Sequence, residues 1–320
     1  MTEQPAVLVL TSLEDVTADL VIAALGDRGV PTVRVDPADI DPATGGELCF
    51  AARLGAGEDR WSGPVRTPSR SVDLGRVRSV YHRRPSPWRF DHLAAPVRDF
   101  ARREAQHGLA GVLFHLPVLH VNAPWAVARA EFKPAQLQVA ADLGFTIPAT
   151  LITNDPDAAR GFAAEHAPVV YKSLRGVPPA DGHAGAIWTQ RIDPADLDES
   201  VQVTAHLFQA EVDKAADARV TVVGRQVSAW LIEAPGTPLD WRSGDFEALE
   251  YSPLKLPEQT IQRLYAYLDH FALAYGCFDF AVHRPTGELT WIECNAAGQW
   301  GFLPDSDGIA DAFAALLQAG

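Results

Sequence analysis

Two short apolar stretches near the C-terminus, residues 277–283 and 289–295, constrain the fold of this chain most strongly. They flank a Pro-Thr-Gly turn and therefore predict an antiparallel hairpin. A register symmetric about that turn places Asp279 opposite Glu293, and the alternation of side chains puts Asn295 on the same face as Glu293. Two carboxylates and an amide oxygen then converge on one patch of the sheet.

This acidic patch has two interpretations. Like charges directly opposite one another destabilise a sheet unless a cation lies between them. Oxygen ligands suit Mg²⁺, which also holds phosphate oxygens. A polar stripe facing solvent on an ordinary hairpin explains the same residues, so the hairpin alone leaves both interpretations open. By alternation, Ile292 and Cys294 point to the opposite face.

The rest of the chain divides into α/β and antiparallel parts. Its 320 residues suffice for two or three domains. The apolar run 6–10, helical spacing over 15–25 and a strand at 32–35 indicate an opening βαβ unit. From about residue 205 the pattern becomes antiparallel, with a hairpin over 220–232 closed by a two-residue turn. The predicted domains are residues 1–120, 121–205 and 206–320.

Composition excludes several classes of protein. Lys and Arg number 27 against 41 Asp and Glu, a formal net charge of −14, which disfavours a nucleic-acid or membrane-surface binder. The three cysteines show no Cys-x-x-Cys spacing, so we expect neither a zinc site nor a disulfide framework, and a cytoplasmic location fits best. No apolar stretch is long enough to span a bilayer, and the N-terminus lacks the features of a signal peptide.

Lys172 stands inside the apolar stretch 169–174, directly before a loop that contains Gly176, Gly182 and Gly185. Glycines allow a backbone to approach a phosphate closely, and a lysine beside them supplies positive charge. A surface lysine that keeps its ammonium group in water explains the position as well.

Two further basic residues and one linker complete the set of candidates. Lys133 stands at the start of a predicted helix, where charged residues are common, and Arg219 lies on a predicted strand, where an ion pair with a hairpin carboxylate would account for it. Residues 209–212 resemble a linker that exposes backbone groups.

Taken in order over about residues 120–300, these features resemble the ATP-grasp superfamily. The resemblance implies an α/β (α+β) ATP-grasp fold with an N-terminal pre-ATP-grasp domain, a central domain and a C-terminal antiparallel domain. It also implies ATP and Mg²⁺ as cofactors. The implied nucleotide-binding residues are Lys133, Lys172, Gln209, Ala210, Glu211, Val212 and Lys214, and the implied Mg²⁺ ligands are Asp279, Glu293 and Asn295. Lys214 departs from the pattern, because many ATP-grasp enzymes place an acidic ribose ligand there.

A closer resemblance is to the graspetide synthetases, ATP-grasp peptide maturases related to microviridin ligases. It rests on residues 80–85, 133–155 and 293–300. Cys294 stands where such enzymes usually have an aliphatic residue, and Ala296-Ala297 replace a more usual Pro-Asn type pair. Neither position needs to supply a metal oxygen.

This resemblance implies a cytoplasmic, homodimeric enzyme that acts on a ribosomally made precursor peptide. An Asp or Glu side chain of the peptide becomes an acyl phosphate, which a Ser or Thr hydroxyl or a Lys amine then attacks to close a ring. Arg219 and Lys172 are the implied catalytic residues. We expect Arg83, Arg84 and Gln299 to contact the acidic core of the peptide, and a leader segment to dock within residues 187–206.

Two other functions remain open on sequence alone. An ATP-grasp ligase acting on free amino acids or a small carboxylic acid would show the same site residues. A nucleotide-binding protein without catalysis is the third possibility, and retention of the complete set of site residues argues against it. ADP release measured with and without peptide would distinguish the three.

Overall fold

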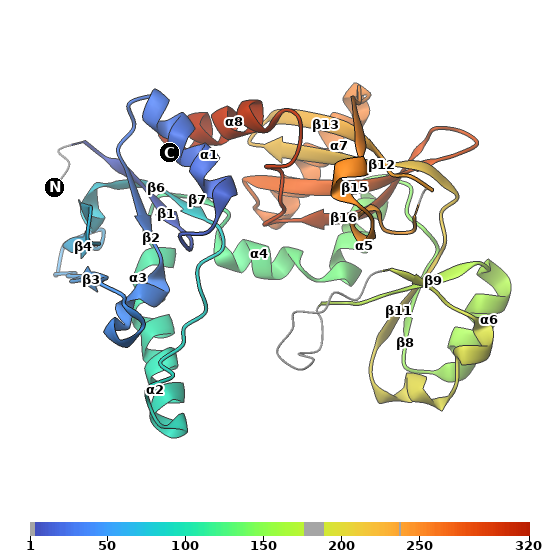
Figure 1. Ribbon diagram of the computed structural model, residues 1–320, viewed down its shortest axis with the longest axis horizontal. Helices are drawn as coiled ribbons and strands as arrows, with labels where there is room; N and C mark the ends of the chain where they lie inside the picture. The colour runs from blue at the N-terminus through green and yellow to red at the C-terminus, as the bar shows by residue number, and fades with distance from the viewer. Residues whose placement is uncertain (1–3, 176–188, 237) are drawn as a thin grey trace.

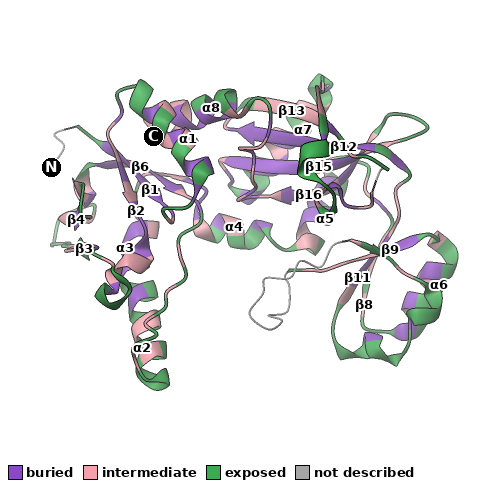
Figure 2. Ribbon diagram, viewed as in Figure 1, coloured by how far each residue is buried: buried purple, intermediate pink, exposed green. Residues whose placement is uncertain are grey.

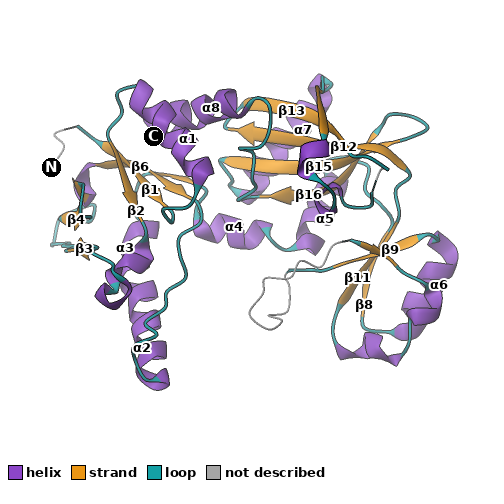
Figure 3. Cartoon of the chain, in the orientation of Figure 1, coloured by secondary structure: helices purple, strands orange, loops and turns teal. Residues whose placement is uncertain are grey.

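The computed structural model describes residues 4–175, 189–236 and 238–320. Within these ranges, the strands form the four sheets visible in Figures 1 and 3. The chain passes from an N-terminal sheet through a central one to an antiparallel C-terminal one, and returns to the first in its last helix.

The N-terminal sheet is parallel, with the order β2-β1-β6-β7. It confirms the predicted βαβ opening. Helix α1 packs beside the C-terminal helix α8, so the two ends of the chain share one apolar cluster (Figure 1). The elements here are β1 (Ala6–Leu10), α1 (Val16–Asp27), β2 (Thr32–Val35), β6 (Val77–His82), α2 (Ala95–Ala105), the π-helical turn Gln106–Ala110, α3 (Gly111–Phe114), β7 (Leu119–Val121) and α8 (Ser306–Ala319), with a small sheet of β3 (Cys49–Phe50), β4 (Pro64–Arg66) and β5 (Ser71–Asp73).

Two helices, α4 (Pro124–Ala130) and α5 (Lys133–Asp142), lead to the central sheet, whose order is β10-β9-β11-β8. One helix, α6, covers this sheet, and the Asp155 side chain caps its first turn by accepting from the Asp157 N–H. The elements are β8 (Thr150–Thr153), α6 (Pro156–His166), β9 (Val169–Lys172), β10 (Gln190–Arg191) and β11 (His206–Ala210).

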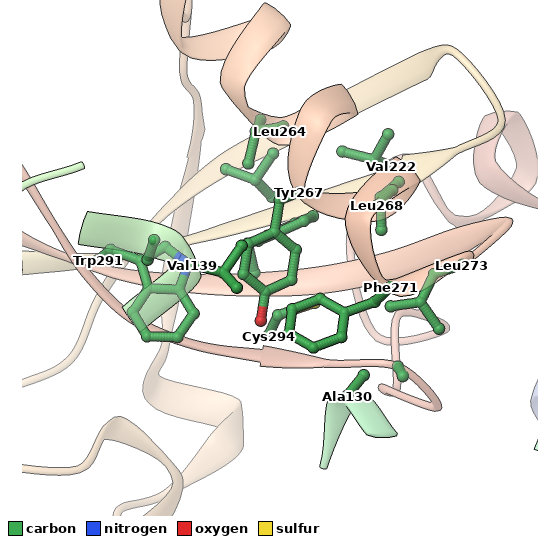
Figure 4. Packing of buried hydrophobic residues seen from close by; sticks show 14 of the residues in the cluster. Ala130, Val139, Val222, Leu264, Tyr267, Leu268, Phe271, Leu273, Trp291 and Cys294 are labelled. Atoms are coloured by element: carbon green, nitrogen blue, oxygen red, sulfur yellow. The ribbon is translucent and has the colours of Figure 1, made fainter. Parts of the chain in front are cut away.

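The C-terminal sheet is antiparallel, with the order β14-β13-β12-β15-β16. Its predicted hairpin with a two-residue turn is confirmed, because Val223 pairs with Gln226. Helix α7 covers one face, and Figure 4 shows its Tyr267 pointing into the core beside Phe271 and Trp291. The elements are β12 (Lys214–Val223), β13 (Gln226–Glu233), β14 (Glu250–Pro253), α7 (Glu258–Phe271), β15 (Tyr275–His283) and β16 (Leu289–Asn295).

Short 3₁₀ turns connect these elements. Most start after an aspartate whose side chain accepts from the backbone N–H two residues on, which is the usual N-cap interaction of this residue type. The turns are Pro37–Ile40, Pro42–Thr44, Leu74–Arg76, Pro194–Asp196, Glu199–Val203, Trp241–Ser243 and Phe246–Ala248.

Candidate functional site

The acidic hairpin has the predicted register, with Asp279 opposite Glu293. The two side chains are only 13% and 15% exposed, so the patch is not a stripe facing solvent. Beyond this pair the register shifts by one residue, and Ile292 is the extra residue of a β-bulge. The expectation that Ile292 points to the core face is therefore wrong: it lines the same cavity as Glu293, whereas Cys294 is buried in the core.

Each carboxylate of the pair has its own cationic partner. Arg219 Nη1 donates to both oxygens of Asp279, at 2.7 and 2.8 Å, and Lys133 Nζ donates to Glu293. Asn295 joins the two, because its Nδ2 lies 3.2 Å from an oxygen of each carboxylate. Arg219 thus makes the ion pair expected of a strand arginine beside this hairpin.

Burial and charge separate the two carboxyl groups. Burial raises the pKa of Asp279, the Arg219 guanidinium opposes this rise, and the net direction is upward. Burial also raises the pKa of Glu293, but Lys133, Arg242 and Lys172 outweigh it and bring the pKa to about 2. Glu293 is therefore an anion at neutral pH.

Lys172, at the end of β9, approaches the same group from the central sheet. Its side chain is half-buried, and burial lowers the pKa of its ammonium to about 8, although Glu293 opposes this shift. Among the described residues, no hydrogen-bond or ion-pair partner holds its Nζ. The glycine-containing loop that follows, with Gly176, Gly182 and Gly185, lies outside the described residues.

A first cavity lies between the central and C-terminal sheets, and all four residues of the 209–212 linker line it. The N–H groups of Ala210 and Glu211 already donate to Ala149 O and Pro168 O. Within the described chain, no group accepts from the N–H of Val212. Gln209 has a buried Oε1 without a partner among the same residues. The unused N–H of Val212 is placed to bind a planar polar ligand, whereas the Gln209 Oε1 is enclosed by protein.

Lys214 also lines this cavity, but its Nζ donates to both oxygens of Asp217, at 2.7 and 2.6 Å. Burial raises the pKa of Asp217 to about 6, although Lys214 opposes the shift. Asp217 also lines this cavity, three residues after Lys214, so the cavity contains an acidic side chain beside the lysine.

A second cavity, of about 720 Å³, is lined by Glu293 and Asn295 of the same cluster. Its lining includes Arg84, Arg219, Gln299 and the aromatic rings of Phe246 and Phe302. Arg84 is exposed, as a residue that contacts a substrate must be. This cavity is within the size range of small-molecule sites and carries basic and apolar walls.

The structure does not bring Arg83 to that cavity surface. The side chain of Arg83 is completely buried and ion-paired with Asp15 at 3.2 Å, so it cannot contact a peptide in this conformation. Gln299 also turns its side chain inward, to Thr17 Oγ1 and Arg83 Nη2 at 2.9 Å each. Strand alternation predicts that adjacent arginines diverge, and Arg84 is the one that faces outward.

Sequence reasoning missed Asp240 and Arg242, which line the first cavity from the loop before β14. Arg242 bonds Asp240 through two nitrogens, at 2.8 Å each, and lies 3.7 Å from Glu293. No periodic pattern marks these residues, because they lie in irregular structure. The run Leu239-Asp240-Trp241-Arg242, with charged residues beside a tryptophan, is the one local sign of them.

The carboxylate cluster fits a magnesium ion better than a transition metal. Within residues 4–175, 189–236 and 238–320, no group of three or more His, Cys, Asp or Glu side chains is placed to hold a metal. Two carboxylates and one amide leave the remaining positions to water or phosphate oxygens, as Mg²⁺ prefers. In the same ranges all three cysteines are free thiols, and no helix is long and apolar enough to cross a membrane.

Comparison with solved structures shows similarity over the whole chain. A RiPP-associated ATP-grasp ligase from Chryseobacterium gregarium, solved with ADP and a leader and core peptide, is 26% identical with a TM-score of 0.88, over 99% of this chain and 97% of that one. The macrocyclase MdnC from Microcystis aeruginosa MRC, solved with its precursor peptide MdnA, is 27% identical with a TM-score of 0.83, over 98% and 99% of the two chains.

The macrocyclase MdnB from the same organism is 28% identical with a TM-score of 0.79, over 99% of this chain and 100% of that one. No family model matches this chain, and no curated protein does. The chain therefore has the ATP-grasp fold and is similar, over nearly its entire length, to ATP-grasp ligases associated with ribosomally made peptides.

Proposed function

We propose that this protein is an ADP-forming ATP-grasp ligase that closes macrocycles in a ribosomal precursor peptide. The observation that carries this proposal is the position of the Asp279–Glu293–Asn295 cluster between two cavities of different character. The first cavity offers backbone and polar groups for a nucleotide. The second offers arginines and aromatic rings for a peptide.

The first cavity supplies the nucleotide contacts. Val212, which lines this cavity, donates its free N–H to the adenine ring. Asp217 accepts from ribose hydroxyls, and Lys214 keeps that carboxylate in place. Lys172 and Lys133 place positive charge on the phosphates, where negative charge accumulates during transfer.

Asp279, Glu293 and Asn295 are the residues that would hold Mg²⁺. The fit rests on Asn295, whose side chain lies within hydrogen-bond distance of both carboxylates. When bound, Mg²⁺ neutralises phosphate oxygens during phosphoryl transfer. The Asn295 amide presents its oxygen after a half-turn, which exchanges two nearly isosteric groups.

The reaction then takes two steps. A peptide carboxylate oxygen attacks the γ-phosphorus of ATP, the bond to the β-phosphate oxygen breaks, and ADP leaves. A peptide hydroxyl or amine next attacks the acyl carbon, loses its proton and expels phosphate, leaving an ester or an amide. Arg219 stands at the boundary of the second cavity, where its guanidinium stabilises the acyl phosphate and the oxyanion.

The peptide side of the proposal has further parts. Arg84 attracts the acidic core of the peptide, which the net charge of −14 would otherwise repel. The leader is proposed to dock within residues 187–206, of which 187 and 188 lie outside the described residues. A homodimer is also proposed, and light scattering of the purified protein tests it.

The test is ADP release from the purified enzyme with peptides that carry acidic and hydroxyl side chains. We expect release with a leader-containing peptide, accompanied by the loss of one water per ring in the mass of that peptide. ADP release at the same rate when free amino acids replace the peptide, together with no mass change in the peptide reaction, would favour the small-molecule ligase instead.

A further inference from the structure

Arg83 lies in the interior, between the N-terminal sheet and the C-terminal part of the chain. It follows β6, and its side chain is 0% exposed while that of Asp15 is 3% exposed. Two arginine nitrogens approach the Asp15 carboxylate, at 3.2 and 3.5 Å. A buried guanidinium needs an ion-pair partner, and Asp15 is that partner on one side of Arg83.

The other side of Arg83 holds a loop that follows β16. Arg83 Nη2 donates to Gln299 Oε1 at 2.9 Å, and Nη1 donates to the Gly298 carbonyl at 3.4 Å. Tyr275 OH donates to the same carbonyl, also at 3.4 Å. The loop is therefore fixed by groups that are distant in sequence.

The same loop contacts Arg219 from its opposite side. The Gln299 carbonyl accepts from Arg219 Nη2 at 2.7 Å, while Arg219 Nη1 bonds Asp279. A Cβ on Gly298 would lie 2.5 Å from Cys277 Cβ and 3.0 Å from Arg219 Nη2, so the close approach of this backbone requires glycine. One peptide segment thus lies directly between two buried guanidinium groups.

We infer that Arg83, held by Asp15, is a positioning residue that orients the guanidinium of Arg219 through the Gly298–Gln299 backbone. This inference rests on the proposed function, in which Arg219 stabilises the acyl phosphate. Under this inference the N-terminal domain affects the rate of the reaction through Asp15 and Arg83, although neither residue lines the second cavity. A displacement of about 1 Å in such a group slows a reaction by up to about a hundredfold.

Arg83→Lys tests this inference, because it keeps the charge and loses the planar fork. We expect kcat to fall about tenfold or more, with the KM for peptide and the Kd for ADP within about twofold of wild type. The matched control is Arg28→Gln, which removes the ion pair of Arg28, the residue after α1, with Asp311 of α8, away from the site. Its kcat should not change.

A double variant separates positioning from general stability. If Arg83 acts through Arg219, Arg83→Lys should add less than about twofold to the loss caused by Arg219→Lys. Fully additive losses would overturn the inference. A raised KM for peptide at unchanged kcat would also overturn it, since Arg83 would then bind substrate.

A readout without turnover makes the test independent of the proposed function. Hydrogen exchange at the Arg219 Nε–H, followed by NMR and assigned with Arg219→Lys, should be faster in Arg83→Lys than in wild type or Arg28→Gln. Unchanged exchange would overturn the inference even in an active enzyme. If wild type shows no peptide-dependent ADP release but the exchange rate changes as expected, the proposed function fails and the positioning contact stands.

Discussion

The two sheets that enclose the first cavity are packed very differently. The C-terminal sheet is backed by α7 and a large cluster that includes Tyr267, Phe278 and Trp291, whereas among the described residues the buried apolar residues of the central sheet are few (Figures 2 and 4). The central cluster consists of Ala159, Ala163, Val169, Leu197, Val201 and Phe208. Low apolar burial means low local stability, so the two sides of the site should differ in rigidity.

This difference matches the division of site residues. The two carboxylates and Arg219 lie on the well-packed sheet, with their charges paired. Lys172 and the 209–210 end of β11 lie on the sparsely packed one. Groups that stabilise developing charge must be held in place, whereas groups that admit and release a nucleotide must move.

The largest expected effect is on the rigid side. Glu293→Gln removes an anion that Lys133 and Arg242 surround, so we expect Mg²⁺-dependent ATP turnover to fall about a hundredfold or more. The control is Cys294→Ala on the adjacent core position, which should cost about 1–2 kcal/mol of stability and little turnover. Equal losses of turnover in both variants would contradict the assigned faces of β16.

On the sparsely packed side, Lys172→Met should abolish ATP turnover yet stabilise the apo protein. Burial lowers the pKa of Lys172 to about 8, below the value of about 10.4 in an unfolded chain. The unfolded chain therefore binds more protons between these pH values. As a result, the free energy of unfolding of the wild-type protein rises with pH in this range. The Tm advantage of Lys172→Met should be complete at neutral pH and shrink as the pH rises through this window.

The matched control is Lys255→Met, which changes an exposed lysine and should leave Tm nearly unchanged at each pH. A Tm advantage of Lys172→Met that grows with pH would show that Lys172 is not a desolvated cation.

Gly298→Ala should have an intermediate effect. Its Cβ would lie 2.5 Å from Cys277 Cβ, and overpacking of this kind costs about 1–3 kcal/mol. Thermal unfolding and turnover measure the two consequences. Gly301→Ala is the comparison, because the nearest atom to its Cβ would be the Thr17 hydroxyl at 3.0 Å, a smaller overlap than the one at Gly298. Equal stability of both variants would contradict the tight fit of the loop.

Hydrogen exchange compares the two sheets directly. Without nucleotide, amides of β9 and β11 should exchange faster than those of β12 and β15, because fewer apolar side chains cover them. ADP should slow exchange more in the central sheet. Equal protection of both sheets in the apo protein would remove the basis of the comparison.

The smallest effect is expected from the ion pair of Arg191 with the linker residue Glu211, at 2.7 Å. Arg191 is 60% exposed, and exposed pairs contribute about 0–1 kcal/mol. Arg191→Gln should therefore leave Tm and the Kd for ADP close to wild type. A large loss of ADP affinity would show that Arg191 holds the linker in place.

Local patterns predicted much of the site. The pairing of Asp279 with Glu293 follows from alternation and turn position, both of which are short-range properties. The bulge at Ile292 could not be predicted in the same way, because it depends on how two strands twist together. Arg242 was missed because irregular loops have no period.

Contacts between distant segments were the hardest to predict. Adjacent arginines were expected to diverge, but only the packing of the 298–299 loop decides that Arg83 is the buried one. The packing of α8 against α1 likewise depends on residues about 300 positions apart. Local sequence patterns do not extend over such a separation.

In the proposed reaction, ATP consumption is coupled to ring closure in a peptide. The most direct test of this coupling measures ADP release and peptide mass together in one reaction, using a leader-containing peptide rich in Asp, Glu, Ser and Thr. We expect one ADP for each water lost from the peptide, and neither ADP nor dehydrated peptide with Glu293→Gln. ADP release without any loss of water from the peptide would contradict this coupling.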